Sequence, residues 1–97
     1  MKQTPENIVK KQVKDYLYWR GWSSFPIMQG LGAHKGIADR IAIRKGQVLF
    51  IEIKSATGKL SVDQMRFKET IEVQGGHYIV ARSCDDIEKY LKEMEST

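Results

Sequence analysis

Asp39, Glu52 and Lys54 are the residues of this sequence whose types and spacing most clearly indicate chemistry. Two carboxylates can hold a divalent cation, and an ammonium beside them can stabilise negative charge that develops on a phosphoryl group. Twelve residues separate Asp39 from Glu52 in the sequence. The three side chains therefore form a site only if the fold brings them together.

The residues between the two carboxylates predict a β-hairpin that would do this. Apolar and polar residues alternate through 39–44 and 48–54, and Lys45-Gly46 between them predicts a tight turn. If the turn is centred there, Asp39 lies opposite Glu52 on the neighbouring strand. Lys54 shares their face, because side chains of a strand alternate between its two faces.

Two carboxylates so placed repel each other by on the order of 3 kcal/mol, at about 5 Å and an effective dielectric constant of about 20. The pair needs a proton, a cation or a metal ion. Lys54 can supply part of the positive charge, and Mg²⁺ or Mn²⁺ would supply more while keeping open positions for water. The alternative is that Asp39 and Glu52 face solvent and that Lys54 only pairs with one of them.

The other segments predict the element order α-β-β-β-α-β-α, an α/β protein with a mixed sheet flanked by helices. The segment 22–28 is extended, 29–36 is a glycine-containing loop, and the strand at 77–82 runs parallel to the second hairpin strand. Thr4 is the expected N-cap and Pro5 the first residue of the first helix, and Ser83 is the expected cap of the last helix. The first helix is expected to stop at Gly21. The second is expected to begin after Ser61 and to end at 74–76, and the last to follow Ser83 and to include Met94.

The first and second helices carry further candidate residues. Ile8, Val9, Val13, Tyr16 and Leu17 are expected on the buried face of the first helix, with Lys10, Lys11 and Lys14 mostly on the other. Ser61 and Gln64 form a capping box at the start of the second helix. Gln64 either serves only as this cap or also orients a water molecule or a phosphate.

Composition and charge restrict the class of protein. The 97 residues predict one domain over 1–97, and no apolar run is long enough to span a membrane. A single cysteine, Cys84, predicts a reducing, intracellular and cytoplasmic setting. Residues 1–60 hold 11 Lys/Arg against 4 Asp/Glu, which favours a polyanionic partner. Five basic residues are expected to flank the proposed site and can hold phosphates, although each alone is equally consistent with plain surface charge: Lys35, Arg40, Arg44, Lys45 and Lys59.

Taken together, Gly36-Ile37-Ala38-Asp39 and Glu52-Ile53-Lys54 resemble the PD-(D/E)xK nuclease motif. Phe50 before Glu52, the loop 57–60 and the helix start at Ser61 to Gln64 make the sequence more similar to the VRR-NUC (virus-type replication-repair nuclease) family. The resemblance covers nearly the whole chain. Ala38 departs from it, because many members have proline at this position, but no expected metal ligand is missing.

The resemblance implies a restriction-endonuclease-like αβββαβ core and a Mg²⁺- or Mn²⁺-dependent DNA endonuclease of bacterial or viral type. It implies a homodimer that hydrolyses phosphodiester bonds of branched DNA, such as a four-way (Holliday) junction in DNA repair. Asp39, Glu52 and the carbonyl of Ile53 would bind the metal with help from Glu6. Lys54 would be the catalytic lysine and Gln64 a supporting residue. The alternatives are a catalytically inactive nucleic-acid-binding module with the same fold and a protein-interaction domain.

Overall fold

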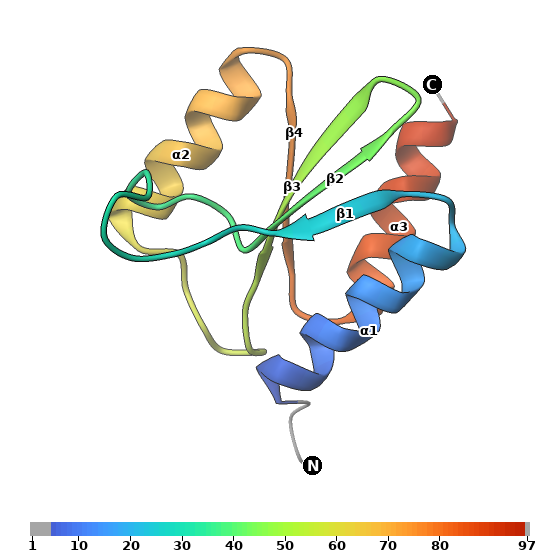
Figure 1. Ribbon diagram of the computed structural model, residues 1–97, viewed down its shortest axis with the longest axis horizontal. Helices are drawn as coiled ribbons and strands as arrows, with labels where there is room; N and C mark the ends of the chain where they lie inside the picture. The colour runs from blue at the N-terminus through green and yellow to red at the C-terminus, as the bar shows by residue number, and fades with distance from the viewer. Residues whose placement is uncertain (1–4, 97) are drawn as a thin grey trace.

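The computed structural model describes residues 5–96 and has a four-stranded mixed sheet at its centre, in the strand order β1-β2-β3-β4. β1 (Ser23–Pro26), β2 (Arg40–Arg44) and β3 (Gln47–Ile53) pair antiparallel, and β4 (His77–Ala81) lies parallel to β3. Figure 1 shows α2 (Val62–Val73) on one side of the sheet, with α1 (Glu6–Trp19) and α3 (Cys84–Glu95) on the other. The predicted fold class and element order are confirmed.

The β2–β3 hairpin has the predicted register, with Ile41 opposite Phe50 and Arg44 opposite Gln47. Its turn is formed by Lys45 and Gly46, whose φ angles are 49° and 80°. Two successive residues with positive φ match the right-handed twist of the flanking strands, which is why such turns close two-residue hairpins. The predicted pairing of the strands therefore extends toward Asp39 and Glu52 at the far end of the hairpin.

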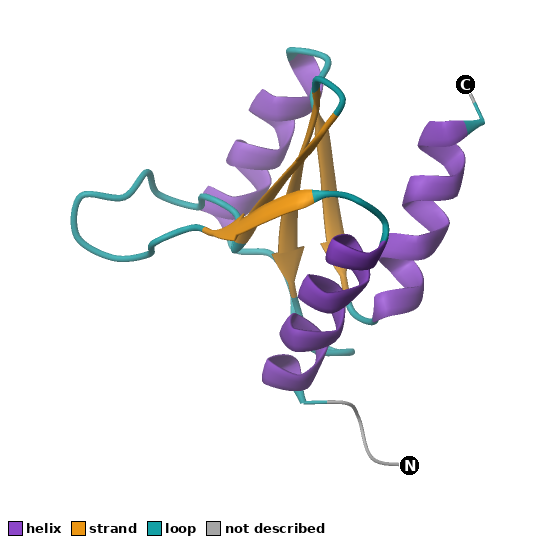
Figure 2. Cartoon of the chain, turned by 45° about the vertical axis from the view of Figure 1, so that its right-hand side comes forward, coloured by secondary structure: helices purple, strands orange, loops and turns teal. Residues whose placement is uncertain are grey.

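The hydrophobic core lies between the sheet and the layer of α1 and α3 (Figure 2). Val9, Val13 and Leu17 of α1 are fully buried, as are Ile87 and Leu91 of α3. Leu49, Ile51 and Ile53 of β3 meet them from the sheet. The predicted buried face of α1 is confirmed for its valines and its leucine, but Ile8 is 45% exposed because it lies at the margin of that face.

The opposite face of the sheet is covered by α2 through aromatic contacts. The Phe67 ring of α2 lies 5.3 Å from the Phe50 ring and 6.0 Å from the Tyr78 ring, measured between ring centroids. Because side chains alternate along β3, Glu52 lies on this same face as Phe50. The α2 layer therefore borders the carboxylate end of the hairpin.

The helix starts differ from the prediction in detail. Pro5 directly precedes α1 instead of occupying its first position, and Thr4 lies outside the described residues. Ser83 precedes α3, but its side chain makes no capping hydrogen bond. A different hydrogen bond forms at this end of the helix, in which the backbone N–H of Arg82 donates to the Asp86 carboxylate. Among the described residues, no helix has the length and apolar character needed to cross a membrane.

Candidate active site

Glu52 is a charged residue buried within the sheet, with only 3% of its surface exposed. Its Oε2 accepts a hydrogen bond from Gln64 Nε2 at 3.2 Å and lies 3.6 Å from Lys54 Nζ. Its Oε1 is also buried and has no hydrogen-bond partner among residues 5–96. A buried polar atom without a partner is costly, so this oxygen is suited to a ligand that the protein chain itself does not provide.

Asp39 is held against the end of β3 by two hydrogen bonds. Its backbone N–H donates to the Ile51 carbonyl at 3.0 Å, and its Oδ2 accepts from the backbone N–H of Ile53 at 2.7 Å. These bonds place the carboxylate beside the last residues of β3. The structure thus brings Asp39 and Glu52 to one place, as the hairpin register predicts.

The pKa of Glu52 is raised from 4.5 to about 7. Burial is the main cause, because it disfavours the charged form, and the negative charge of Asp39 acts in the same direction. Lys54 opposes the shift by lowering this pKa. One ammonium thus only partly offsets two carboxylates, and a further positive charge would favour the ionised pair.

Gln64 has two partners, one on each side of its amide group. Its Oε1 accepts from the backbone N–H of Ser61 at 2.8 Å, which completes the predicted capping box, while its Nε2 donates to Glu52. The capping interaction is therefore not its whole role. Through Gln64, the first turn of α2 determines the position of one oxygen of Glu52.

Two loops enclose this site. Gly36 packs so tightly against the start of α2 that a Cβ added to it would lie 2.2 Å from the carbonyl oxygen of Asp63. The loop after β3 is held by Arg82, whose Nη1 donates to the carbonyls of Ser55 and Gly58, both at 2.6 Å. This role of Arg82 was not predicted, because nothing local in the sequence connects it to a loop 24 residues or more away.

Three further residues that the sequence predicts at the site are Glu6, Lys35 and Lys59. Glu6, in the first turn of α1, forms an ion pair of 3.9 Å with Lys10. Within residues 5–96, no group of three or more His, Cys, Asp or Glu side chains is arranged to hold a metal ion, so Glu6 does not join Asp39 and Glu52 as a third acid. Lys35 lines a hollow of about 330 Å³ together with Gln64, and Lys59 lies in the loop between β3 and α2.

Arg44 and Lys45 are not at the site. They lie at the turn end of the hairpin, whereas Asp39 and Glu52 lie at its other end. Lys45 follows Asp39 by six positions along an extended strand, which corresponds to roughly 20 Å. The expectation that these two residues flank the carboxylates is therefore wrong, because it treated nearness in the sequence as nearness in space.

Two residues that the sequence did not indicate do lie beside Asp39. Lys10 of α1 and Gln29 of the loop after β1 line a pocket of about 190 Å³ together with Asp39, Arg40 and Ile53. Gln29 Nε2 also donates to the Ala38 carbonyl at 3.0 Å. Lys10 has the spacing of an ordinary solvent-facing helix residue, and only the packing of α1 against the sheet shows where it lies.

Solved structures share this fold. The model superimposes on a structure titled "VRR_NUC domain" with a TM-score of 0.77 and 21% sequence identity, over 90% of this chain and 94% of the other. A second, titled "VRR_NUC domain protein", gives a TM-score of 0.74 and 20% identity over 94% and 88% of the two chains. No protein-family model and no curated protein matches the sequence. The chain therefore has the fold of VRR_NUC domains.

Proposed function

We propose that this protein is a metal-dependent deoxyribonuclease that hydrolyses phosphodiester bonds, with Asp39, Glu52 and Lys54 at its active site. The observation that carries the proposal is the buried Glu52, which lies beside Asp39 and has one oxygen without a partner among the described residues. The likeness of the fold to VRR_NUC domains supports the same assignment.

The donor set suits Mg²⁺ or Mn²⁺. These cations prefer oxygen ligands and need only one or two carboxylates, because water and substrate phosphate complete their coordination. Asp39, Glu52 and the backbone carbonyl of Ile53 would hold the ion. The assisting role of Glu6 rests on the motif resemblance alone, because its carboxylate pairs with Lys10 and does not join the other two acids. A cation here would satisfy Oε1 of Glu52 and favour the ionised form that burial disfavours.

The bound ion would polarise the scissile phosphoryl group and lower the pKa of a water molecule. The residues of this chain do the rest. Lys54, with its side chain 18% exposed, is accessible enough to contact a phosphate while staying near Glu52. Its ammonium would stabilise the negative charge that develops on the phosphoryl oxygens in the transition state. Gln64 keeps Oε2 of Glu52 in one position, which leaves Oε1 for the ion.

The substrate we propose is branched DNA, such as a four-way junction, and the active form a homodimer with one site in each copy. The motif resemblance supports both statements. Sedimentation velocity tests the oligomeric state directly: a single species near 11.2 kDa at cleavage-active concentrations contradicts the dimer.

Cleavage of labelled DNA tests the function. A four-way junction and a linear duplex of equal length are incubated with Mg²⁺, Mn²⁺ or EDTA. We expect cuts only with metal, and preferentially in the junction. Lys54→Ala should reduce the rate by on the order of 100-fold, as expected when a group that stabilises transition-state charge is removed. Lys45→Ala removes the same residue type at the distant turn and should cleave like the wild type.

Two outcomes contradict the enzyme. If the protein binds DNA with strong salt dependence but cuts it with neither metal, it is a catalytically inactive binding module. If Lys54→Ala cleaves as fast as Lys45→Ala, the site lies elsewhere. Circular dichroism of both variants shows whether any loss of activity comes from loss of folding.

A further inference from the structure

The pocket between α1 and the start of β2 has two cations in its lining and includes the carboxylate Asp39. Its lining includes Lys10, Arg40 and Asp39, with Pro26, Ile27 and Ile53 as its apolar part. Its volume of about 190 Å³ is sufficient for a phosphate group and its first waters. Asp39 therefore belongs both to the candidate active site and to this pocket.

Arg40 is the more informative of the two cations. It is partly buried, and one guanidinium nitrogen donates to the neutral Ser24 hydroxyl at 2.9 Å. It forms no ion pair with any carboxylate of residues 5–96. A guanidinium has five N–H donors, so one that donates to a hydroxyl has donors left for an anion from outside the chain.

Lys10 provides the second cation from a different element. Its partner within the described residues is Glu6, at 3.9 Å, and both side chains are about half exposed (49% and 47%). An exposed ion pair of this kind contributes little free energy, so the ammonium is available to a stronger anion. The lining of the pocket thus offers an anion two cations, Lys10 and Arg40, against one carboxylate, Asp39.

We propose that Lys10 and Arg40 bind a backbone phosphate of the DNA next to the scissile one, in the pocket beside Asp39. The proposal rests on the nuclease function above and adds a binding site to it. A strand whose scissile phosphate lies at Asp39 and Glu52 places a neighbouring phosphate a short distance away along its backbone. A phosphate held there fixes the register of the strand but carries no base recognition.

The test compares Lys10→Gln with Lys11→Gln. The two lysines are neighbours on α1, but Lys11 pairs with Asp15, is 77% exposed and does not line the pocket. Binding of a fluorescent four-way junction is measured in EDTA over a range of salt concentrations. Lys10→Gln should weaken binding about tenfold at low salt and reduce the slope of log K against log salt by about one, the effect of losing one phosphate contact. Lys11→Gln should follow the wild type.

Cleavage kinetics provide the second measurement. Lys10→Gln should raise KM with kcat nearly unchanged, because the contact is the same in substrate and transition state. Equal affinity, salt slope and KM for Lys10→Gln and Lys11→Gln would overturn the pocket while leaving the nuclease assignment intact. If the wild type cuts no DNA but Lys10→Gln still binds more weakly than Lys11→Gln, the pocket stands and the nuclease assignment fails.

Discussion

At the scale of one residue, the burial of Glu52 lowers the stability of the fold but suits a ligand-binding site. A carboxylate with 3% exposure and one unpartnered oxygen among the described residues lowers the stability of a domain. Hydrophobic neighbours, Ile51 and Ile53, occupy the adjacent positions of the same strand at no such cost. Residues that violate the usual rules of burial are concentrated at functional sites, which is why Glu52 marks the site more clearly than any surface charge.

The raised pKa of Glu52 predicts how stability depends on pH in the metal-free protein. The unfolded chain loses the proton near pH 4.5 and the folded chain near pH 7. Between these values the folded state binds more protons, so the free energy of unfolding falls as pH rises and then levels off above pH 7. The loss from this group is at most about 3 kcal/mol. Urea unfolding in EDTA at intervals of pH measures it.

Glu52→Gln cannot ionise and should lose this part of the pH dependence. The exposed Glu69→Gln is the matched control and should retain the wild-type profile. A Glu52→Gln curve parallel to the wild type between pH 4.5 and 7 would show that folding does not change the pKa of Glu52, contrary to the raised value.

At the scale of elements, the contact between Gly36 and the start of α2 joins the glycine loop to the site. Gly36 has a φ of 78° and no room for a Cβ, which would lie 2.2 Å from a backbone oxygen. Gly32, in the same loop, has a φ of 89° and open space around it. A side chain at Gly32 would therefore add backbone strain alone, whereas a side chain at Gly36 would add backbone strain and a steric clash.

Gly36→Ala should destabilise the protein far more than Gly32→Ala. Gly32→Ala pays only for a left-handed residue with a side chain, about 1–2 kcal/mol. Gly36→Ala adds a clash with backbone that cannot rotate away, so we expect a further loss of at least about 2 kcal/mol. Urea unfolding of both variants measures the difference. Equal losses would mean that the loop moves away from α2 without penalty.

The elements that the sequence predicts well are those determined by local signals. Lys45-Gly46 and the flanking alternation set the hairpin register, and that register alone brings Asp39 to Glu52. Ser61 and Gln64 specify the start of α2 by direct hydrogen bonds. The contact of Gln64 with Glu52 is longer-range and was not predicted, because the sequence offered only capping or, in addition, the orientation of a water molecule or a phosphate.

The parts that the sequence does not predict depend on how elements pack. Lys10 reaches the site only because α1 lies against the sheet, and no periodicity within a helix contains that information. Arg82 holds a loop that precedes it by more than twenty residues. Arg44 was misplaced for the converse reason, since it is close to Asp39 in sequence but lies at the other end of a straight strand.

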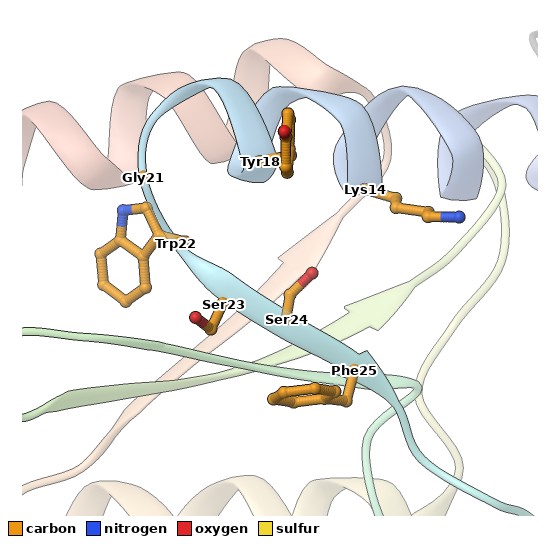
Figure 3. Close-up of a pocket in the computed structure, with 7 residues that line it drawn as sticks. All are labelled: Lys14, Tyr18, Gly21, Trp22, Ser23, Ser24 and Phe25. Carbon is orange, nitrogen blue, oxygen red and sulfur yellow. The ribbon is translucent and has the colours of Figure 1, made fainter.

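For the molecule as a whole, the distribution of charge favours one side for the DNA binding that we propose. Residues 61–97 hold 8 Asp/Glu against 5 Lys/Arg, and most of these acids belong to α3. Because α3 covers the sheet face opposite to α2, this acidic helix lies away from Glu52 (Figure 1). A mostly apolar hollow of about 430 Å³ lies beside β1, and its lining includes Tyr18, Trp22 and Phe25 (Figure 3). Lys14 is the one cation among its lining residues.

Two double variants with the same change in net charge test on which side of the sheet DNA binds. Lys35→Gln/Lys59→Gln removes two exposed cations from the loops around the candidate active site, and Lys89→Gln/Lys92→Gln removes two exposed cations from α3. If DNA lies on the α2 side, the first variant loses phosphate contacts, and the salt dependence of binding becomes shallower by up to about two units of slope. The second variant should bind nearly as the wild type does, because its lysines lie among the acids of α3, where Lys92 already pairs with Glu88.

Fluorescence anisotropy with the same four-way junction across a salt series compares the two double variants. An equal loss in both variants would mean that net charge alone attracts the DNA, and a larger loss in the α3 variant would place it on the opposite side of the sheet.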